Sequence, residues 1–150
     1  MPARFPKNIA ILFLFAIVSL IYACGDVEPE SMRLDVSNDC ESGQAKVGIH
    51  DLYMEIYCGC SEPAGSTSNS GSRMHCSIPT GTNITMFIFS HKTPHLIRSV
   101  GTNVIPTSPP VYPNETGISS IGHGFTLDQP GNYDFDDEFN STLSGRFRVF

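Results

Sequence analysis

From residue 33 onward the sequence contains short stretches in which apolar and polar residues alternate, a period-two pattern that is typical of half-buried β-strands. The stretch at 83–89 is apolar enough to lie at the centre of a sheet. No amphipathic helix of useful length accompanies these stretches. The pattern predicts an all-β chain that forms a Greek-key β-sandwich of seven to eight strands. The expected strands are 33–36, 45–50, 52–57, 83–89, 96–100, 124–127, 133–135 and 145–150.

Two stretches break this pattern and are expected to lie outside the strands. Residues 61–72 are rich in Gly, Ser, Thr and Asn and contain no large apolar residue, so they predict a long surface loop. A tolerated insertion is the favoured interpretation of this loop, and a recognition role is the alternative. Residues 101–117 contain four prolines, which exclude a central strand and predict an extended connection.

The first 25 residues have the layout of a secretory signal peptide. Two basic residues precede an apolar run at 9–23, which is too short for a comfortable membrane span. Removal of residues 1–25 would leave one domain at 26–150, secreted to the extracellular space and without a membrane span. Lipidation at Cys24 and an uncleaved anchor are the alternatives.

The charge balance limits the kinds of partner. The formal net charge is -6 and no run of Lys or Arg occurs, so nucleic acid and anionic membrane surfaces are poor candidates. Basic or neutral partners fit better. The acidic group at 134–138 lacks the ligand spacing and the glycine of a calcium loop, which favours a solvated acidic turn.

The cysteines predict two disulfides. Loss or lipidation of Cys24 leaves four cysteines, an even number that suits two disulfides in an oxidising compartment. Two disulfides are favoured over a Cys-x-Cys metal site. Cys58 and Cys60 flank a single glycine and are too close for an easy bond to each other. Each is therefore expected to pair with Cys40 or Cys76, and the sequence leaves both connectivities open.

Three N-x-[ST] sequons mark candidate N-glycosylation sites, at Asn83, Asn114 and Asn140. Three sequons after a signal peptide favour a eukaryotic secretory protein, and they predict a glycoprotein.

Two motif spacings in the C-terminal half carry a family resemblance. The turn at 130–133 reads PGxY, and Gly145 begins a closing strand after it. Earlier, Gly81 starts a strand that is followed by Pro94 and His95. Over residues 76–150 both spacings resemble those of the cupredoxins, the small blue-copper proteins of the amicyanin and pseudoazurin kind. The resemblance implies a cupredoxin-like β-sandwich.

The resemblance also implies a position for each copper ligand. The first His ligand of the family falls on His95, whereas the positions of its Cys, His and Met ligands fall on Asp137, Asn140 and Leu143. A type-1 copper site needs a thiolate, two imidazoles and a weak axial thioether, and only His95 remains of that set. We therefore expect no cofactor and no electron transfer. A weak Cu(II) site built from His95 with His91 or Asp137 is the alternative.

The remaining motifs give no reason to expect an enzyme. The sequence contains no nucleophile elbow, HExxH motif or phosphate loop. His50, His75 and His123 have no partner that the sequence identifies and are expected to be ordinary surface or satisfied histidines. The sequence favours a secreted, non-redox cupredoxin-like module that binds an extracellular protein or glycan. A divergent cupredoxin that binds copper through His95 and oxygen ligands, and a β-sandwich of other ancestry, are the alternatives.

Overall fold

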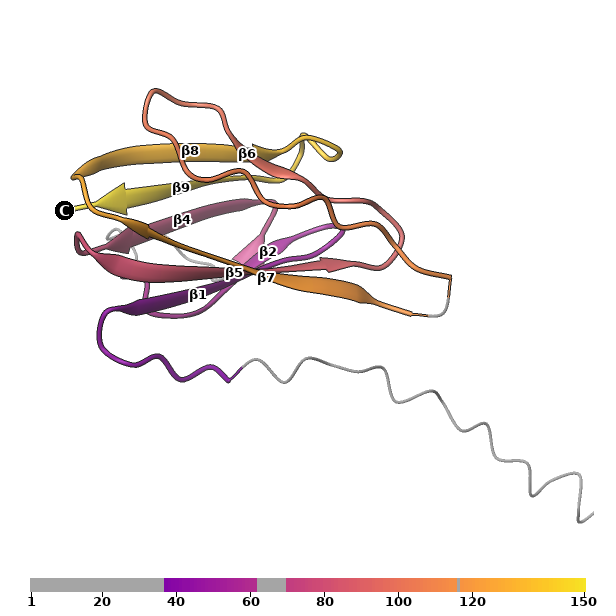
Figure 1. Ribbon diagram of the computed structural model, residues 1–150, viewed down its shortest axis with the longest axis horizontal. Helices are drawn as coiled ribbons and strands as arrows, with labels where there is room; N and C mark the ends of the chain where they lie inside the picture. The colour runs from indigo at the N-terminus through magenta and orange to yellow at the C-terminus, as the bar shows by residue number, and fades with distance from the viewer. Residues whose placement is uncertain (1–36, 62–69, 116) are drawn as a thin grey trace, which may run out of the picture. The chain divides into compact units, whose positions relative to one another are not determined.

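The computed structural model describes residues 37–61, 70–115 and 117–150, which form strands and no helix. One sheet has five strands in the order β3-β2-β1-β5-β7, and the other has four in the order β4-β9-β8-β6. Figure 1 shows the sheets as two layers, with β8, β9 and β4 in one and β5, β7 and β1 in the other. The strands are β1 Gln44–Ile49, β2 Met54–Cys58, β3 Ser70–Gly71, β4 Arg73–Ile78, β5 Thr82–Ser90, β6 Ile97–Ser99, β7 Ser119–Leu127, β8 Gly131–Asp137 and β9 Ser144–Val149.

The predicted all-β sandwich is confirmed. From β3 to β8 the chain changes sheet at every step, as in a Greek-key arrangement. Each sheet is mixed, because β1 pairs with β5 and β4 pairs with β9 in parallel, whereas the other pairs are antiparallel. The strand count exceeds the expected seven to eight by the two-residue strand β3.

The sheets pack through side chains that alternate along their strands. In β5, Ile84, Met86 and Ile88 are fully buried, as expected for the most apolar stretch of the sequence. The ring of Phe147 in β9 meets that of Phe125 in β7 edge-on at 6.0 Å between centroids, and so joins the two sheets. Burial of each such side chain contributes roughly 1.5–3 kcal/mol. One continuous core therefore lies between the layers.

Most predicted strands are present, three parts of the prediction need correction, and two lie outside the described residues. β4 was not predicted, and β7 starts at Ser119 rather than at residue 124. β3 lies within the predicted loop at 61–72 and pairs with β2, so that loop is not entirely irregular. The predicted strand at 33–36 lies outside the described residues, as does the predicted signal peptide with Cys24.

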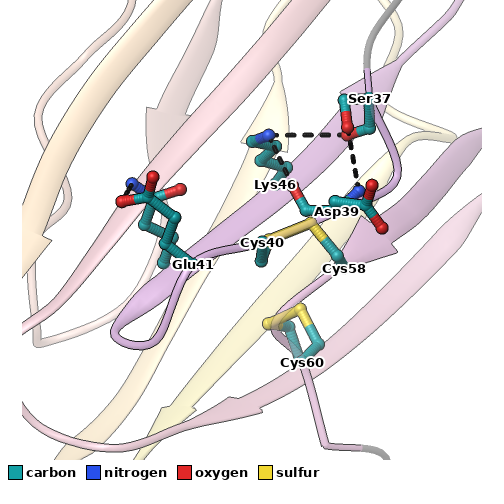
Figure 2. The surroundings of a disulfide bond; sticks show 9 residues. Ser37, Asp39, Cys40, Glu41, Lys46, Cys58 and Cys60 are labelled. Atoms are coloured by element: carbon teal, nitrogen blue, oxygen red, sulfur yellow. Dashed lines mark hydrogen bonds between the residues drawn. A yellow bond between two sulfur atoms is a disulfide. The ribbon is translucent and has the colours of Figure 1, made fainter.

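Two disulfides link the C-terminal end of β2 and the residues after it to other parts of the sandwich. Of the two connectivities that the sequence leaves open, the structure has Cys40 bonded to Cys58 and Cys60 bonded to Cys76. Figure 2 shows the first bond beside Lys46, whose Nζ donates a hydrogen bond of 2.8 Å to the carbonyl oxygen of Asp39. The second bond links the segment after β2 to β4, and thus connects the two sheets.

The connection between β6 and β7 is extended, as its prolines predict. Figure 1 shows it running lengthwise along the sandwich. Its Ile105, Ser108 and Val111 are buried. Val111 and His95 exchange two backbone hydrogen bonds of 2.9 Å, which fix the backbone of His95 against this connection. Among the described residues, no helix has the length and apolar character needed to cross a membrane.

Candidate functional site

The candidate site forms where three loops meet at one end of the sandwich. Residues 50–53 connect β1 to β2, residues 91–96 connect β5 to β6, and residues 138–143 connect β8 to β9. β1 and β5 run parallel and end side by side, which places their following loops together. Hydrogen bonds from His95 in the second loop reach Asp51 in the first and Asp137 at the end of β8.

His95 is fully buried and both of its ring nitrogens face carboxylates. Its Nδ1 lies 2.5 Å from Oδ2 of Asp137, and its Nε2 lies 3.1 Å from Oδ1 of Asp51. An ionised carboxylate only accepts hydrogen bonds, whereas an imidazolium carries an N–H on each nitrogen. The protonated ring therefore satisfies both contacts at once.

The two carboxylates also hold the backbone of the surrounding loops. Oδ1 of Asp137, a fully buried residue, accepts hydrogen bonds of 3.1 Å from the N–H groups of Leu96 and Phe139. Asp51 accepts one of 3.1 Å from the N–H of His91 and one of 2.8 Å from that of Lys92. Charged hydrogen bonds of this kind are the stronger class, so the network fixes all three loops.

Charge and hydrogen bonding shift the pKa values of this network in opposite directions. Burial lowers the pKa of His95, but the hydrogen bonds and charges of Asp137 and Asp51 outweigh burial and raise it overall. Burial raises the pKa of Asp51, but hydrogen bonds from the His91 backbone, His95 and the Lys92 backbone lower it overall. Both shifts favour the charged form of the residue.

The four positions to which the resemblance assigns copper ligands all lie at this site. His95 and Asp137 are in direct contact, and Asn140 joins them through Asp51, because its Nδ2 donates a hydrogen bond of 2.8 Å to the Asp51 carbonyl oxygen. Leu143 is fully buried, and its carbonyl oxygen accepts a hydrogen bond of 3.1 Å from the N–H of Asp137.

Sequence reasoning missed Asp51, which completes the network. The only signal at this position was the break that His50 and Asp51 make between two predicted strands. Asp51 lies 44 positions before His95 in the sequence, and no motif links the two.

A type-1 copper ion does not fit this set of side chains. The site has no thiolate or thioether, and Asp137 and Asn140 offer only oxygen and amide groups. The two nitrogens of His95 point away from each other toward different carboxylates, so the three groups do not converge on one point. Among the described residues, no group of three or more His, Cys, Asp or Glu is arranged to hold a metal ion. The side chain of His91 is exposed, and only its backbone contacts the network.

Two of the three remaining histidines have partners that the sequence did not identify. His50 stacks on Tyr53 and Phe89, and its Nε2 lies 2.8 Å from Oε1 of Glu55. Burial is the main cause that lowers the pKa of His50. Nε2 of His123 lies 3.0 Å from the carbonyl oxygen of Pro106.

The predicted acidic turn is wrong. Asp134, Asp136 and Asp137 belong to strand β8 rather than to a turn. Asp134 pairs with Arg146, and Asp136 pairs with Arg98. Asp134 and Asp136 are therefore partners of arginines on neighbouring strands, whereas Asp137 is the buried partner of His95.

The sequons occupy three different environments. Asn83 is exposed in β5, and Asn114 is exposed on the connection between β6 and β7. Asn140 is half-buried, and its Oδ1 accepts hydrogen bonds from Thr142 while its Nδ2 donates to Asp51.

Exposed apolar side chains surround the network. Leu52 follows Asp51 and is 81% exposed, and Phe139 precedes Asn140 and is 45% exposed. Tyr112 is 59% exposed, and its ring lies 6.3 Å from that of Phe139. We call Leu52, Tyr112 and Phe139 the apolar rim.

Comparison with solved structures places cupredoxins among the neighbours of this chain. A purple cupredoxin from Nitrosopumilus maritimus is 21% identical over 71% of this chain and 99% of its own, with a TM-score of 0.43. Rusticyanin from Thiobacillus ferrooxidans is 11% identical over 71% of this chain and 76% of its own, with a TM-score of 0.48. A reduced Cu(I) form of an amicyanin mutant is 14% identical over 76% of this chain and 90% of its own, with a TM-score of 0.44. No protein-family model and no curated protein matches the sequence. These three structural neighbours are cupredoxins.

Proposed function

We propose that this chain is a secreted, non-redox binding module in which a network of Asp51, His95 and Asp137 stands where the motif spacing assigns a copper site. One observation carries this proposal: the fully buried His95 has a carboxylate oxygen at 2.5 Å from one ring nitrogen and at 3.1 Å from the other. A metal ion would have to displace one carboxylate from the ring. The network binds the loops together in the way that a metal would, without redox chemistry.

The apolar rim supports a binding role for this end of the molecule. Leu52 and Phe139 lie on loops that the network fixes, and Tyr112 follows Val111, whose backbone pairs with that of His95. An apolar surface is thus presented in a defined arrangement. Aromatic residues are enriched at the centres of protein interfaces, and preformed surfaces lose less entropy on binding. The proposed partner of the rim is an extracellular protein.

Two further features support an extracellular location. Two disulfides are typical of proteins from an oxidising compartment. Asn83 and Asn114 are exposed sequons, where a glycan can be attached without disturbing the core. Neither residue belongs to the network.

Copper titration tests the non-redox part of the proposal. The purified secreted chain is incubated with one equivalent of Cu(II), desalted, and analysed for copper content and visible absorption, beside a His95→Gln variant. We expect no stoichiometric copper in either protein. Copper that the natural chain retains and the His95→Gln variant loses would instead establish the divergent copper protein that uses His95 with oxygen ligands.

The rim is tested by substitution. A Leu52→Ser/Phe139→Ser variant should still fold, because neither side chain belongs to the buried core: Leu52 is 81% exposed and Phe139 is 45% exposed. On a panel of purified extracellular domains, any domain bound through the rim should lose at least about tenfold in affinity. Val104→Ser is the control, since Val104 is 68% exposed and lies outside the rim. Equal loss in the control would contradict a role for the rim.

A further inference from the structure

The parallel pairing of β4 with β9 brings together basic residues that are far apart in the sequence. His75 lies opposite Arg146. Two residues further along both strands, on the same face, Arg148 lies opposite Ser77. Arg73 stands two residues before His75. The burial pattern of both strands turns these four side chains outward, onto the surface of the four-stranded sheet. We call Arg73, His75, Arg146 and Arg148 the basic strip.

The strip concentrates positive charge on an acidic protein. The described residues contain six Lys and Arg side chains, and three of them belong to the strip. Arg146 is neutralised by Asp134, with its Nε 2.5 Å from one carboxylate oxygen and its Nη2 3.1 Å from the other. Arg73 and Arg148 form no ion pair within the described residues. Two exposed guanidinium groups are therefore available for an anion from outside.

The surface between these arginines is shallow, and it is mainly polar near Arg148. One hollow is lined by Arg73, His75, Ser144 and Arg146 together with Asp134 and the half-exposed Val100, and a second, more polar one by His75, Ser77, Asn132, Arg146 and Arg148. Protein interfaces are usually built around an apolar centre, and one exposed side chain, Val100, does not form one. Guanidinium groups bind oxyanions through two parallel hydrogen bonds, and hydroxyl and amide groups can bind sugar hydroxyls.

The dimensions and charge of the strip favour a thin linear polyanion. Arg148 lies opposite Ser77, four residues after Arg73. Strand residues rise about 3.3 Å each, so the strip is roughly 13 Å long. The net charge of the chain is -6, and a broad anionic surface such as a membrane or a duplex would bring its charges close to the acidic remainder of the molecule. A narrow chain can contact the strip alone.

We infer that the basic strip binds a sulfated polysaccharide, with Arg73 and Arg148 each contacting a sulfate. This surface lies on the outer face of the four-stranded sheet, and it goes beyond the binding role proposed for the apolar rim. The expectation drawn from sequence, that nucleic acid and anionic membrane surfaces are poor candidates, is kept, because a sulfated polysaccharide is a different class of anion. The basic residues cluster only through strand pairing, so no run of Lys or Arg in the sequence predicts the cluster.

The experiment measures heparin binding by the full secreted chain at several NaCl concentrations. We expect an Arg73→Ser/Arg148→Ser variant to bind at least about tenfold more weakly, and its plot of log K against log salt to be shallower by about two. Lys92→Ser is the matched control, because Lys92 is exposed and lies outside the strip, and it should change affinity less than twofold. Melting temperatures verify that the variants are folded.

A second variant should strengthen binding, which a misfolded protein would not do. Asp134→Asn removes the carboxylate that neutralises Arg146, so heparin affinity should rise severalfold. Unchanged binding in both variants would overturn the inference, as would an equal loss with Lys92→Ser. Binding to uncharged dextran as strong as to heparin would also overturn it. If the Arg73→Ser/Arg148→Ser substitution weakened binding to phosphatidylserine vesicles more than binding to heparin, the site would be assigned to lipid instead. None of these outcomes affects the copper titration, so the two proposals fail independently.

Discussion

At the scale of single residues, the network of Asp51, His95 and Asp137 places three ionisable groups in or near the core. Removing charges from water costs several kcal/mol for each ion, and only well-formed hydrogen bonds offset that cost. Here Asp137 accepts three hydrogen bonds and Asp51 accepts three on its carboxylate. No buried polar side-chain atom of the described residues lacks a partner.

The network should make folding stability depend on pH in two directions. The folded pKa of His95 is raised above its ordinary value of 6.5. The stabilisation that His95 contributes to the fold is therefore complete below pH 6.5, and it is lost as pH rises through the folded pKa. The folded pKa of Asp51 is lowered below 3.8, so its contribution is complete above 3.8 and is lost as pH falls through the folded pKa. Urea unfolding, followed by circular dichroism across this range, measures both limbs. A His95→Gln variant should lack the alkaline limb, and an unchanged limb would show that another group causes it.

Substitution of Asp137 by Asn should cost roughly 3 kcal/mol of unfolding free energy. The amide oxygen can still accept from the N–H groups of Leu96 and Phe139, but the buried charge of His95 loses its nearest partner. Urea unfolding at pH 6 measures this loss. Asp136→Asn is the control, because Asp136 pairs with the exposed Arg98 and such surface pairs contribute about 1 kcal/mol or less. Equal effects of the two substitutions would contradict the assigned role of Asp137.

Motif spacing predicted that His95, Asp137 and Asn140 would lie together, and they do. The spacing could not reveal how they interact, because hydrogen bonds depend on side-chain orientation and on residues from other loops. Asp51 is the clearest example, since its role follows only from the parallel pairing that brings the loop after β1 beside the loop after β5.

At the scale of strands, close packing explains why the second residue of β9 is a glycine. A methyl group added at Gly145 would overlap the ring of Phe135 in β8, which lies across the glycine and is fully buried. The glycine that marks the resemblance to cupredoxins is thus a packing requirement of this sheet. Its φ angle is not positive, so steric contact and not backbone conformation excludes a larger residue.

Gly145→Ala should therefore destabilise the protein by roughly 1–3 kcal/mol, because the core must shift to accommodate the added atoms. Chemical denaturation measures this change. Gly117→Ala is the matched control, since nothing lies within 4 Å of its added carbon, and its effect should stay within about 0.5 kcal/mol. A neutral Gly145→Ala would mean that Phe135 moves freely.

The strands that sequence analysis missed or shortened share a physical cause. β4 does alternate between exposed and buried residues, but it follows directly on the polar loop, and its outward positions carry Arg and His. In β7 the outward positions include Gly122 and Gly124, which interrupt the pattern of side chains that identifies a strand. Periodicity was informative where large apolar residues alternate, as in β5, and weak where small residues occupy one face.

At the scale of the whole molecule, the two disulfides differ in what they connect. Their sequence separations are 18 and 16 residues, so the entropy that each removes from the unfolded chain is nearly equal, at about 3 kcal/mol. The bond between Cys60 and Cys76 also links the two sheets, and Cys76 is 1% exposed in the core.

Removal of the bond between Cys60 and Cys76 should therefore cost more than removal of the bond between Cys40 and Cys58. We expect a Cys40→Ala/Cys58→Ala variant to lose roughly 3 kcal/mol and a Cys60→Ala/Cys76→Ala variant to lose more, through its added core defect. Melting temperatures and urea midpoints of the two variants give the comparison. The reverse order would show that packing around Cys76 contributes little.

The position of β9 has a consequence for how the protein is made. β9 lies between β4 and β8, and β4 has no other neighbour in its sheet. A ribosome releases β4, β6 and β8 before the strand that connects β4 to the rest of the layer. Until residues 144–149 emerge, β4 and β8 each have an open edge that can pair with another nascent chain. The bond between Cys60 and Cys76 can form earlier and hold β4 near β2, so formation of this disulfide before β9 is complete would protect the half-finished sandwich from mispairing.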